Sequence, residues 1–182
     1  MTALISLHNT LFGWLDRASG IILPTLARFT FAAVMLAYFW KSAVTKLGSG
    51  LFGIFSPSDG AYVQIFPRAM EAVGYDSSQL GLFHWLVALA GTWAEFILPA
   101  LILVGLFSRL AAIGMIGFVF VQSATDVVGH GATDVKTLGA WFDGVPDSVI
   151  LDQRLLWVTV LAIIVVKGAG PISLDRLMGR LT

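Results

Sequence analysis

The apolar run from Leu80 to Phe107 constrains this chain more than any other feature of its sequence. Crossing about 30 Å of bilayer hydrocarbon takes about 20 mainly apolar residues in a helix, and this run exceeds that length. Three further stretches reach or approach it. We therefore expect four membrane-spanning helices, at about 21–41, 80–107, 109–129 and 150–167. The last is the weakest on hydropathy, because Asp152 and Arg154 shorten its uninterrupted part, although Arg154 can snorkel from a helix end.

Composition agrees with an integral membrane protein. The mean hydropathy is +0.86, and only 12% of the residues are charged, whereas a soluble domain carries about 25%. Eleven basic and eleven acidic residues balance, which gives no general attraction for nucleic acid. There is no cysteine, so disulfides, thiolate metal sites and dithiol redox chemistry are excluded. We predict one all-α, multi-pass domain over residues 1–182, a membrane four-helix bundle without a nucleic-acid function.

Shorter helices are expected outside the spans. Leucines recur at helical spacing from Leu4 to Leu15, a pattern typical of an amphipathic helix that lies in the membrane interface. The stretch 20–24 then predicts a turn into the bilayer. A short helix is expected over 62–73, in the loop between the first two spans. The apolar, Gly-rich start of that loop, about 48–55, is expected to pack on the membrane face.

Basic residues near the helix ends set the orientation of most membrane proteins. On the side of both termini these are Arg17, Arg109, Lys167, Arg176 and Arg180. On the other side they are Lys41, Lys46, Arg68, Lys136 and Arg154. The numbers are equal, but the tight turn before Arg109 and the basic tail lie closer to the membrane than the longer loops. We therefore expect both termini on the cytoplasmic side.

Two charged residues inside the predicted spans are the first candidates for function. An ionisable group at the depth of Glu95 costs roughly 2.5–3.5 kcal/mol, so it normally faces a partner or a wet cavity. Arg28 interrupts the first span, and a rise of 1.5 Å per residue puts it roughly 10 Å, and Glu95 roughly 18 Å, from the same face. One interpretation is a salt bridge that fixes helix register. The other is a catalytic or ligand-binding pair in which Glu95 relays protons beside a cation.

A second polar cluster is expected at the opposite face of the membrane. It comprises Lys41, His84, Gln122, Asp126, His130 and Asp134. Asp126, His130 and Asp134 follow one another at four-residue intervals, so a continuing helix would align three metal ligands. Gly129 speaks against that continuation, and the commoner role of such residues is to cap a helix end or meet solvent. Asp126 could also pair with Lys41.

Deep tryptophans and nearby polar groups are candidates for contact with a planar cofactor. Trp93 and Trp157 lie deeper than the other tryptophans, where they can stack on a ligand or simply pack inside the bundle. With Trp93, the polar side chains of Lys41 and Gln122 complete the predicted cofactor-binding set.

Three stretches of sequence carry a family resemblance. They are Arg28 with Lys41 and Thr45-Lys46-Leu47-Gly48; Glu95 with the stretch from Leu101 to Ala112; and the closing Lys167-Gly168-Ala169-Gly170-Pro171-Ile172-Ser173-Leu174-Asp175. Together they resemble the DoxX family of four-helix bacterial membrane proteins. The match covers about Leu26 to Leu177, and the closing string is its most specific part. The chain departs from the family where Phe39-Trp40 precede Lys41, since a glycine commonly stands before that lysine.

The resemblance implies a four-helix bundle in the bacterial cytoplasmic membrane and a role in membrane-linked oxidoreduction. Proteins similar to it include the small membrane subunit of thiosulfate:quinone oxidoreductases and a partner in a mycobacterial detoxification complex with superoxide dismutase and a sulfurtransferase. The leading hypothesis is thus a membrane subunit of a quinone-linked oxidoreductase or redox-stress complex, with quinone or another lipophilic ligand near Glu95. Quinone reduction takes up two protons with two electrons, which suits a protonatable carboxyl beside a cation.

Two other functions stay open. A non-catalytic membrane scaffold or assembly factor fits a chain without a redox-active side-chain pair or cofactor motif. A small metal- or solute-handling membrane protein would use Asp126, His130 and Asp134. Besides the lipid bilayer, we expect protein partners in a membrane complex or a homo-oligomer, because four spans alone make a small transport pathway.

Overall fold

A computed structural model describes residues 2–179 of the chain. Over these residues the protein is all-α, 74% helical and without strands. Four helices are long and apolar enough to cross a membrane: Thr2–Thr45, Leu82–Val104, Ser108–Gly129 and Val149–Lys167. The last three agree with the predicted spans to within a few residues. The first begins at Thr2, far before the predicted start at 21, and ends at Thr45, a few residues after the predicted end at 41.

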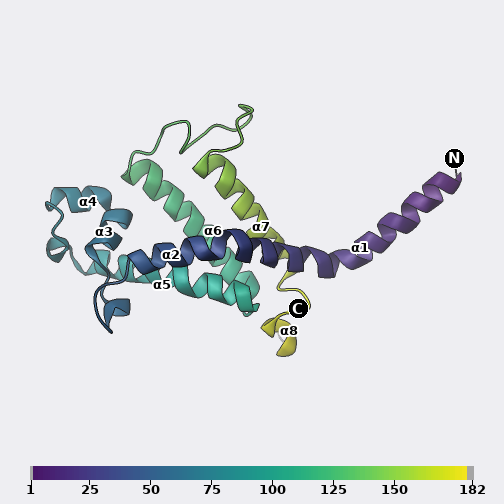
Figure 1. The fold of residues 1–182 in the computed structure, drawn as a ribbon, viewed down its shortest axis with the longest axis horizontal. Helices are drawn as coiled ribbons and strands as arrows, with labels where there is room; N and C mark the ends of the chain where they lie inside the picture. Colours follow the sequence, from purple (N-terminus) through teal and green to yellow (C-terminus); the bar gives the residue numbers. More distant parts are fainter. Residues whose placement is uncertain (1, 180–182) are drawn as a thin grey trace.

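The first helix is continuous. It consists of α1 (Thr2–Phe31), the π-helical turn η1 (Ala32–Leu36) and α2 (Ala37–Thr45). The predicted turn over 20–24 is wrong, because Pro24 sits inside α1, where a proline removes only one backbone hydrogen bond. The N-terminal half of α1 projects away from the other helices (Figure 1), so the helix predicted from Leu4 to Leu15 is the exposed start of the first span helix.

The other spans complete a four-helix arrangement. They are α5 (Leu82–Val104); α6 (Ser108–Ala124) with the π turn η4 (Thr125–Gly129); and the π turn η5 (Val149–Gln153) with α7 (Arg154–Lys167). The chain packs α2 against α5, α5 against α6, α6 against α7, and α7 back against α1, which closes the ring. In Figure 1, α6 and α7 run side by side at an angle across α1, α2 and α5.

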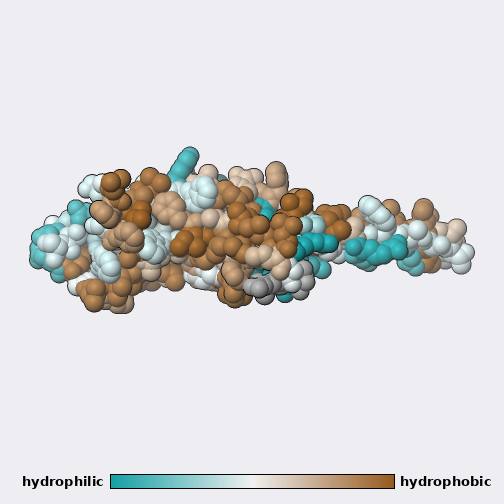
Figure 2. All heavy atoms as spheres, turned by 90° about the horizontal axis from the view of Figure 1, so that it is seen from below, coloured by the Kyte–Doolittle hydropathy of each residue, from teal (hydrophilic) through white to brown (hydrophobic). Residues whose placement is uncertain are grey.

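The core of the bundle is apolar and aromatic. Its fully buried large side chains include Phe31, Met35, Phe39, Ile102, Met115, Leu161 and Ile164. Trp157 packs against Tyr38 and Phe39 at ring-centroid distances of 5.1 and 5.8 Å, which agrees with the packing role considered for this tryptophan. Many large apolar side chains remain exposed, and Figure 2 shows them over much of one face, as expected for a lipid-facing surface.

Two short helices replace the single helix predicted over 62–73. They are α3 (Asp59–Ile65) and α4 (Pro67–Ala72). Pro67 starts the second one, because a proline is well suited to the first helical position but cannot continue a helix from the preceding residues. Met70 is buried in a second small core formed by α3, α4 and α5.

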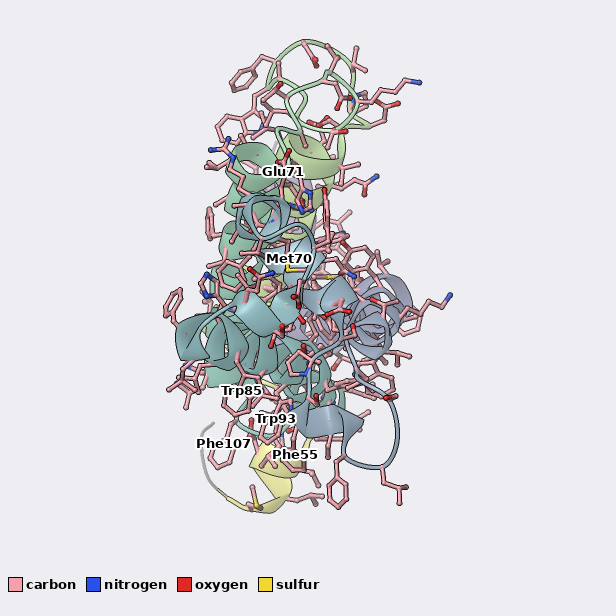
Figure 3. The ribbon with its side chains drawn as sticks, turned by 90° about the vertical axis from the view of Figure 1, so that its left-hand side faces the viewer. Phe55, Met70, Glu71, Trp85, Trp93 and Phe107 are labelled. Atoms are coloured by element: carbon pink, nitrogen blue, oxygen red, sulfur yellow. The ribbon has the colours of Figure 1, made fainter. Side chains whose placement is uncertain are left out.

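The loop before α3 folds back along α5. Leu47 and Pro57 pair as an isolated bridge that closes the loop at its base. At its far side the indole N–H of Trp93 donates to the carbonyl of Ile54 at 2.7 Å. The ring of Phe55 packs edge-on against Trp93 (Figure 3). The loop therefore contacts the middle of a span helix, whereas its sequence predicted packing on the membrane face.

Three further helical turns are η2 (Gly53–Phe55), η3 (Ser77–Gln79) and α8 (Leu174–Leu177).

Candidate functional site

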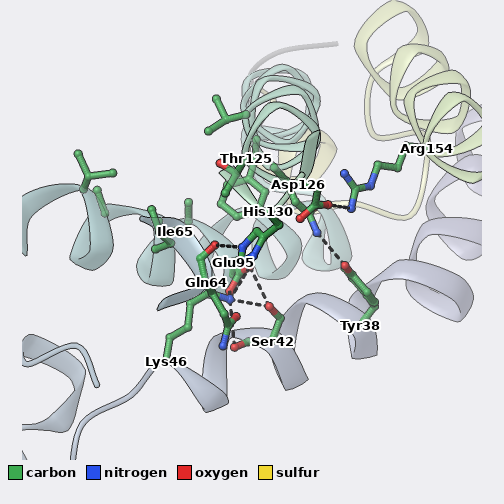
Figure 4. Close-up of a pocket in the computed structure, with 17 residues that line it drawn as sticks. Tyr38, Ser42, Lys46, Gln64, Ile65, Glu95, Thr125, Asp126, His130 and Arg154 are labelled. Carbon is green, nitrogen blue, oxygen red and sulfur yellow. Dashed lines mark hydrogen bonds and ion pairs between the residues drawn. The ribbon is translucent and has the colours of Figure 1, made fainter. Parts of the chain in front are cut away.

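A pocket of about 520 Å³ opens between the helices. Side chains of α2, α3, α5, α6, η4 and α7 line it (Figure 4). They are Tyr38, Ser42, Lys46, Gln64, Ile65, Val87, Ala90, Gly91, Ala94, Glu95, Phe118, Val121, Gln122, Thr125, Asp126, His130 and Arg154. Of the residues predicted for a site, the pocket gathers Glu95, Gln122, Asp126 and His130. It leaves out Arg28, Lys41, Trp93 and Asp134.

The partner of Glu95 is Lys46. The Lys46 Nζ lies 2.9 Å from one carboxylate oxygen of Glu95 and 3.1 Å from the other. Ser42 joins them, because its hydroxyl accepts from Nζ at 2.6 Å and donates to the carboxylate at 3.0 Å. The side chains of Lys46 and Glu95 are only 6% and 3% exposed. We call Ser42, Lys46 and Glu95 the buried pole of the pocket.

The predicted pairing of Arg28 with Glu95 is wrong. The guanidinium of Arg28 donates to the carbonyls of Ile102 and Leu103, in the last turn of α5. It also donates to the carbonyls of Ala169 and Ile172, in the tail after α7. Arg28 therefore binds the carbonyl ends of two segments, where a positive charge complements the helix dipole.

Asp175 holds the neighbouring turn. Its two carboxylate oxygens accept from the backbone N–H groups of Phe107 and Ser108, at 2.7 and 3.0 Å. These are the first amides of α6, which lack partners within the helix. Arg28 and Asp175 together fasten the tail to the α5–α6 turn, so the family-like closing string has a structural role at this end of the bundle.

A second ion pair lines the pocket. Arg154 Nη2 lies 2.5 Å from a carboxylate oxygen of Asp126, and Arg154 Nη1 donates to the hydroxyl of Ser123 at 2.9 Å. The alternative partner of Asp126, Lys41, is exposed and does not line the pocket. Asp126 lies in the π turn η4 and Arg154 follows the π turn η5, and such turns often occur at functional sites.

This second pole also contains an amide and a phenol. Gln122 Nε2 donates to the hydroxyl of Tyr38 at 2.7 Å. We call Tyr38, Gln122, Asp126 and Arg154 the arginine pole. The side chain of Arg154 is 5% exposed and that of Asp126 is 29% exposed, so the arginine pole reaches the surface through Asp126.

The metal site predicted from Asp126, His130 and Asp134 does not form. Within residues 2–179 no three His, Asp or Glu side chains are placed to hold a metal ion. The helix ends at η4, and Gly131 then takes a positive φ of 69°, which redirects the chain. His130 Nε2 contacts the carbonyl of Gln64 at 3.0 Å. Asp134 instead caps its own loop.

The pKa of the Asp134 carboxyl is lowered chiefly by hydrogen bonds from Thr137. The Asp134 carboxylate accepts from the backbone N–H of Thr137 at 3.0 Å and of Lys136 at 3.1 Å. This is the local capping role that Asp commonly plays in loops.

Sequence reasoning missed four members of the pocket's poles: Tyr38, Ser42, Lys46 and Arg154. Hydropathy predicts Lys46 in an extramembrane loop, because the predicted first span ends at Lys41. A signal was available, since Ser42 and Lys46 are four residues apart and share a helix face once the helix continues.

Comparison of the chain with protein-family models, with curated proteins and with solved structures found no match. The geometry of the pocket is therefore the basis for proposing a function.

Proposed function

We propose that the protein is a DoxX-like membrane subunit of a quinone-linked oxidoreductase or redox-stress complex, and that its pocket binds quinone or another lipophilic ligand. The observation that carries this proposal is an apolar-walled pocket of about 520 Å³ between the spans, with the buried pole on its wall. Ligand sites are commonly cavities of about 300–1,000 Å³ with a few polar groups that fix orientation. We place the protein in the bacterial cytoplasmic membrane, with both termini cytoplasmic.

The walls suit a flat ring. Ala90 and Ala94 present only methyl groups on α5, Gly91 between them has no side chain, and Phe118 and Val121 line the pocket from α6. Small residues allow a ring to approach the helix backbone closely. The pocket thus offers a slot with polar groups in its lining, which fits a quinone headgroup.

The polar groups suit proton handling next to such a ring. A bound quinone supplies the chemistry of a two-electron, two-proton acceptor. Glu95 can hold a proton at its carboxylate, and Lys46 and Ser42 keep that carboxylate in place at the pocket wall. The chain has no cysteine, so electrons would arrive from a partner protein in the membrane complex.

A scaffold remains the second candidate, and one observation favours it. The polar groups of the buried pole already form hydrogen bonds with one another, because the Lys46 ammonium donates to Glu95 and Ser42. Fixing the register of the helices would be a sufficient role for an ion pair of this kind.

Mass spectrometry of small molecules extracted from the protein in mild detergent separates the two functions. Glu95→Gln keeps the shape of the side chain but removes its charge, and Glu71→Gln makes the same change on the exposed side of α4. Quinone enriched in the wild type and in Glu71→Gln, and lost in Glu95→Gln protein that keeps the wild-type helical circular-dichroism spectrum, would support the binding site. The absence of any enriched ligand from all three preparations would favour the scaffold.

A further inference from the structure

The exposed residues of the pocket lining mark where the pocket meets its surroundings. They are Tyr38, Gln64, Ala90, Val121 and His130. Hydrogen bonds bridge the pocket edge at three of them. Gln122 Nε2 donates to the Tyr38 hydroxyl, which joins α6 to α2. His130 Nε2 contacts the Gln64 carbonyl at 3.0 Å, which joins the end of η4 to α3 (Figure 4).

The remaining edge, between α5 and α6, is apolar. It is formed by Ala90 on α5 and Val121 on α6. Neither side chain has a polar atom, so no side-chain hydrogen bond can close this edge. Val121 is 65% exposed although it lines the pocket. We call Ala90 and Val121 the apolar mouth of the pocket.

The apolar mouth lies at hydrocarbon depth. At 1.5 Å per residue, Ala90 is about 12 Å along α5 from its start at Leu82, and Val121 is about 12 Å from the end of its span at Gly129. These two spans are 23 and 22 residues long, which matches the length needed to cross about 30 Å of hydrocarbon. The mouth therefore opens toward acyl chains and not toward water.

An apolar groove continues from the pocket on the outside of the bundle. Ile65, Val121 and Thr125 line both the pocket and this groove. The groove runs between the start of α4 and the end of the α6–η4 span, and its walls include the apolar side chains of Ala124 and Val128. Val121 thus belongs to the pocket, to its mouth and to the groove.

We infer that the pocket takes a tailed amphiphile sideways from the bilayer, with the polar headgroup inside the pocket and the hydrocarbon tail leaving through the apolar mouth into the groove. The headgroup then lies among the buried pole and the arginine pole, which line the same pocket. The tail follows a path that is apolar and stays in lipid. This inference rests on the proposed lipophilic ligand site and adds the shape of the ligand and its route.

Two probes that share a headgroup and differ in the tail test this inference. They are 2,3-dimethoxy-5-methyl-1,4-benzoquinone and its 6-decyl derivative, titrated by calorimetry into the protein in lipid nanodiscs, with empty nanodiscs as the blank. Val121→Trp places a bulky ring in the mouth. It should weaken binding of the decyl probe about ten-fold or more, since overpacking an occupied path costs about that factor, and leave the tailless probe nearly unchanged.

Ile113→Trp is the matched control. Ile113 is 53% exposed on α6 but lines neither the pocket nor the groove, so this variant should bind both probes like the wild type. Lipid takes up the decyl chain equally in every variant, so the change between variants isolates the effect of the mouth. Ala90→Trp repeats the test from α5 if Val121→Trp fails to fold. Unchanged binding of the decyl probe, or equal weakening of both probes, would overturn the inference.

A nitroxide spin label tests the depth of the mouth without a ligand, because the chain has no cysteine of its own. Val121→Cys and Thr133→Cys, the latter in the exposed loop after η4, would carry the label in nanodiscs. Oxygen concentrates in hydrocarbon and a nickel(II) chelate in water. The label at Val121 should collide more often with oxygen, and the label at Thr133 more often with the chelate. Preferred collision of the chelate with the label at Val121 would refute a mouth in lipid.

A tailed probe without a quinone ring, N-decylacetamide, separates this inference from the proposed function. Binding of both quinones that Val121→Trp does not alter would leave the proposed function standing and refute the inference. Binding of N-decylacetamide that Val121→Trp weakens, without binding of either quinone, would support the lateral route and refute the quinone. Failure of all three probes to bind would refute both.

Discussion

Removing one partner of the buried pole should destabilise the protein strongly. In Glu95→Gln the ammonium of Lys46 stays buried and loses its countercharge. The charged atoms are 2.9 Å apart, so at an effective dielectric constant of about 20 their attraction is about 6 kcal/mol, which bounds the effect from above. Losing one member of a buried pair typically costs about 3–5 kcal/mol of the free energy of unfolding, and we expect that range.

The double variant Lys46→Met/Glu95→Leu distinguishes the charge from the packing. Replacing both charges with apolar groups of similar volume is often neutral or stabilising, so this variant should be more stable than either single variant. Free energies of unfolding would be measured by titration with SDS in mixed micelles, followed by tryptophan fluorescence.

Two exposed residues provide controls for this cycle. Lys41→Met and Glu71→Gln make the same changes at the surface, where we expect effects within about 0.5 kcal/mol. If Glu95→Gln proves as stable as these controls, then the pair contributes little and the reasoning from burial is refuted.

Three further outcomes follow from the structure. Arg28→Lys loses the forked contacts to four carbonyls and should lower the free energy of unfolding by about 2–3 kcal/mol in the same titration. Gly105→Ala should lower the free energy of unfolding by more than about 1 kcal/mol, because φ is +72° and the new Cβ would lie 2.5 Å from the side chain of Ser173 in the tail. Gly20→Ala, which has open space around it, should not lower the free energy of unfolding. The pKa of Asp76 is lowered from 3.8, chiefly by the Ser78 side-chain hydrogen bond. The turn that Asp76 caps should therefore keep its protection against amide exchange above pH 3.8 and lose it as the pH falls through the lowered pKa. The variant Asp76→Ala should lack this pH dependence.

Hydropathy predicted the spans well because burial of apolar surface in lipid depends on composition over a whole helix. It could not predict which charges meet. The depth argument placed Arg28 and Glu95 at compatible heights along the membrane normal, but it fixed neither the rotation of each helix nor its neighbour. The guanidinium of Arg28 lies beside the last turn of α5, and this turn is two helical turns beyond Glu95. The free carbonyls of that turn are as good a partner for a guanidinium as a carboxylate is.

Local backbone changes limited the second prediction. Asp126 and His130 both line the pocket, as their four-residue spacing suggested. The π turn η4 ends the helix before Asp134 could align with them, and Gly131 then redirects the chain. Neither a π turn nor a left-handed glycine has a pattern that hydropathy or periodicity can detect.

The division of the intramembrane charges has a consequence for the function. Arg28 binds backbone carbonyls outside the pocket, whereas Lys46 and Arg154 bind carboxylates within it. The cation that holds the tail against the helices, Arg28, is therefore separate from the two cations that line the pocket, Lys46 and Arg154. Because the two pocket cations are already neutralised, selectivity must come from hydrogen-bond type and not from net charge.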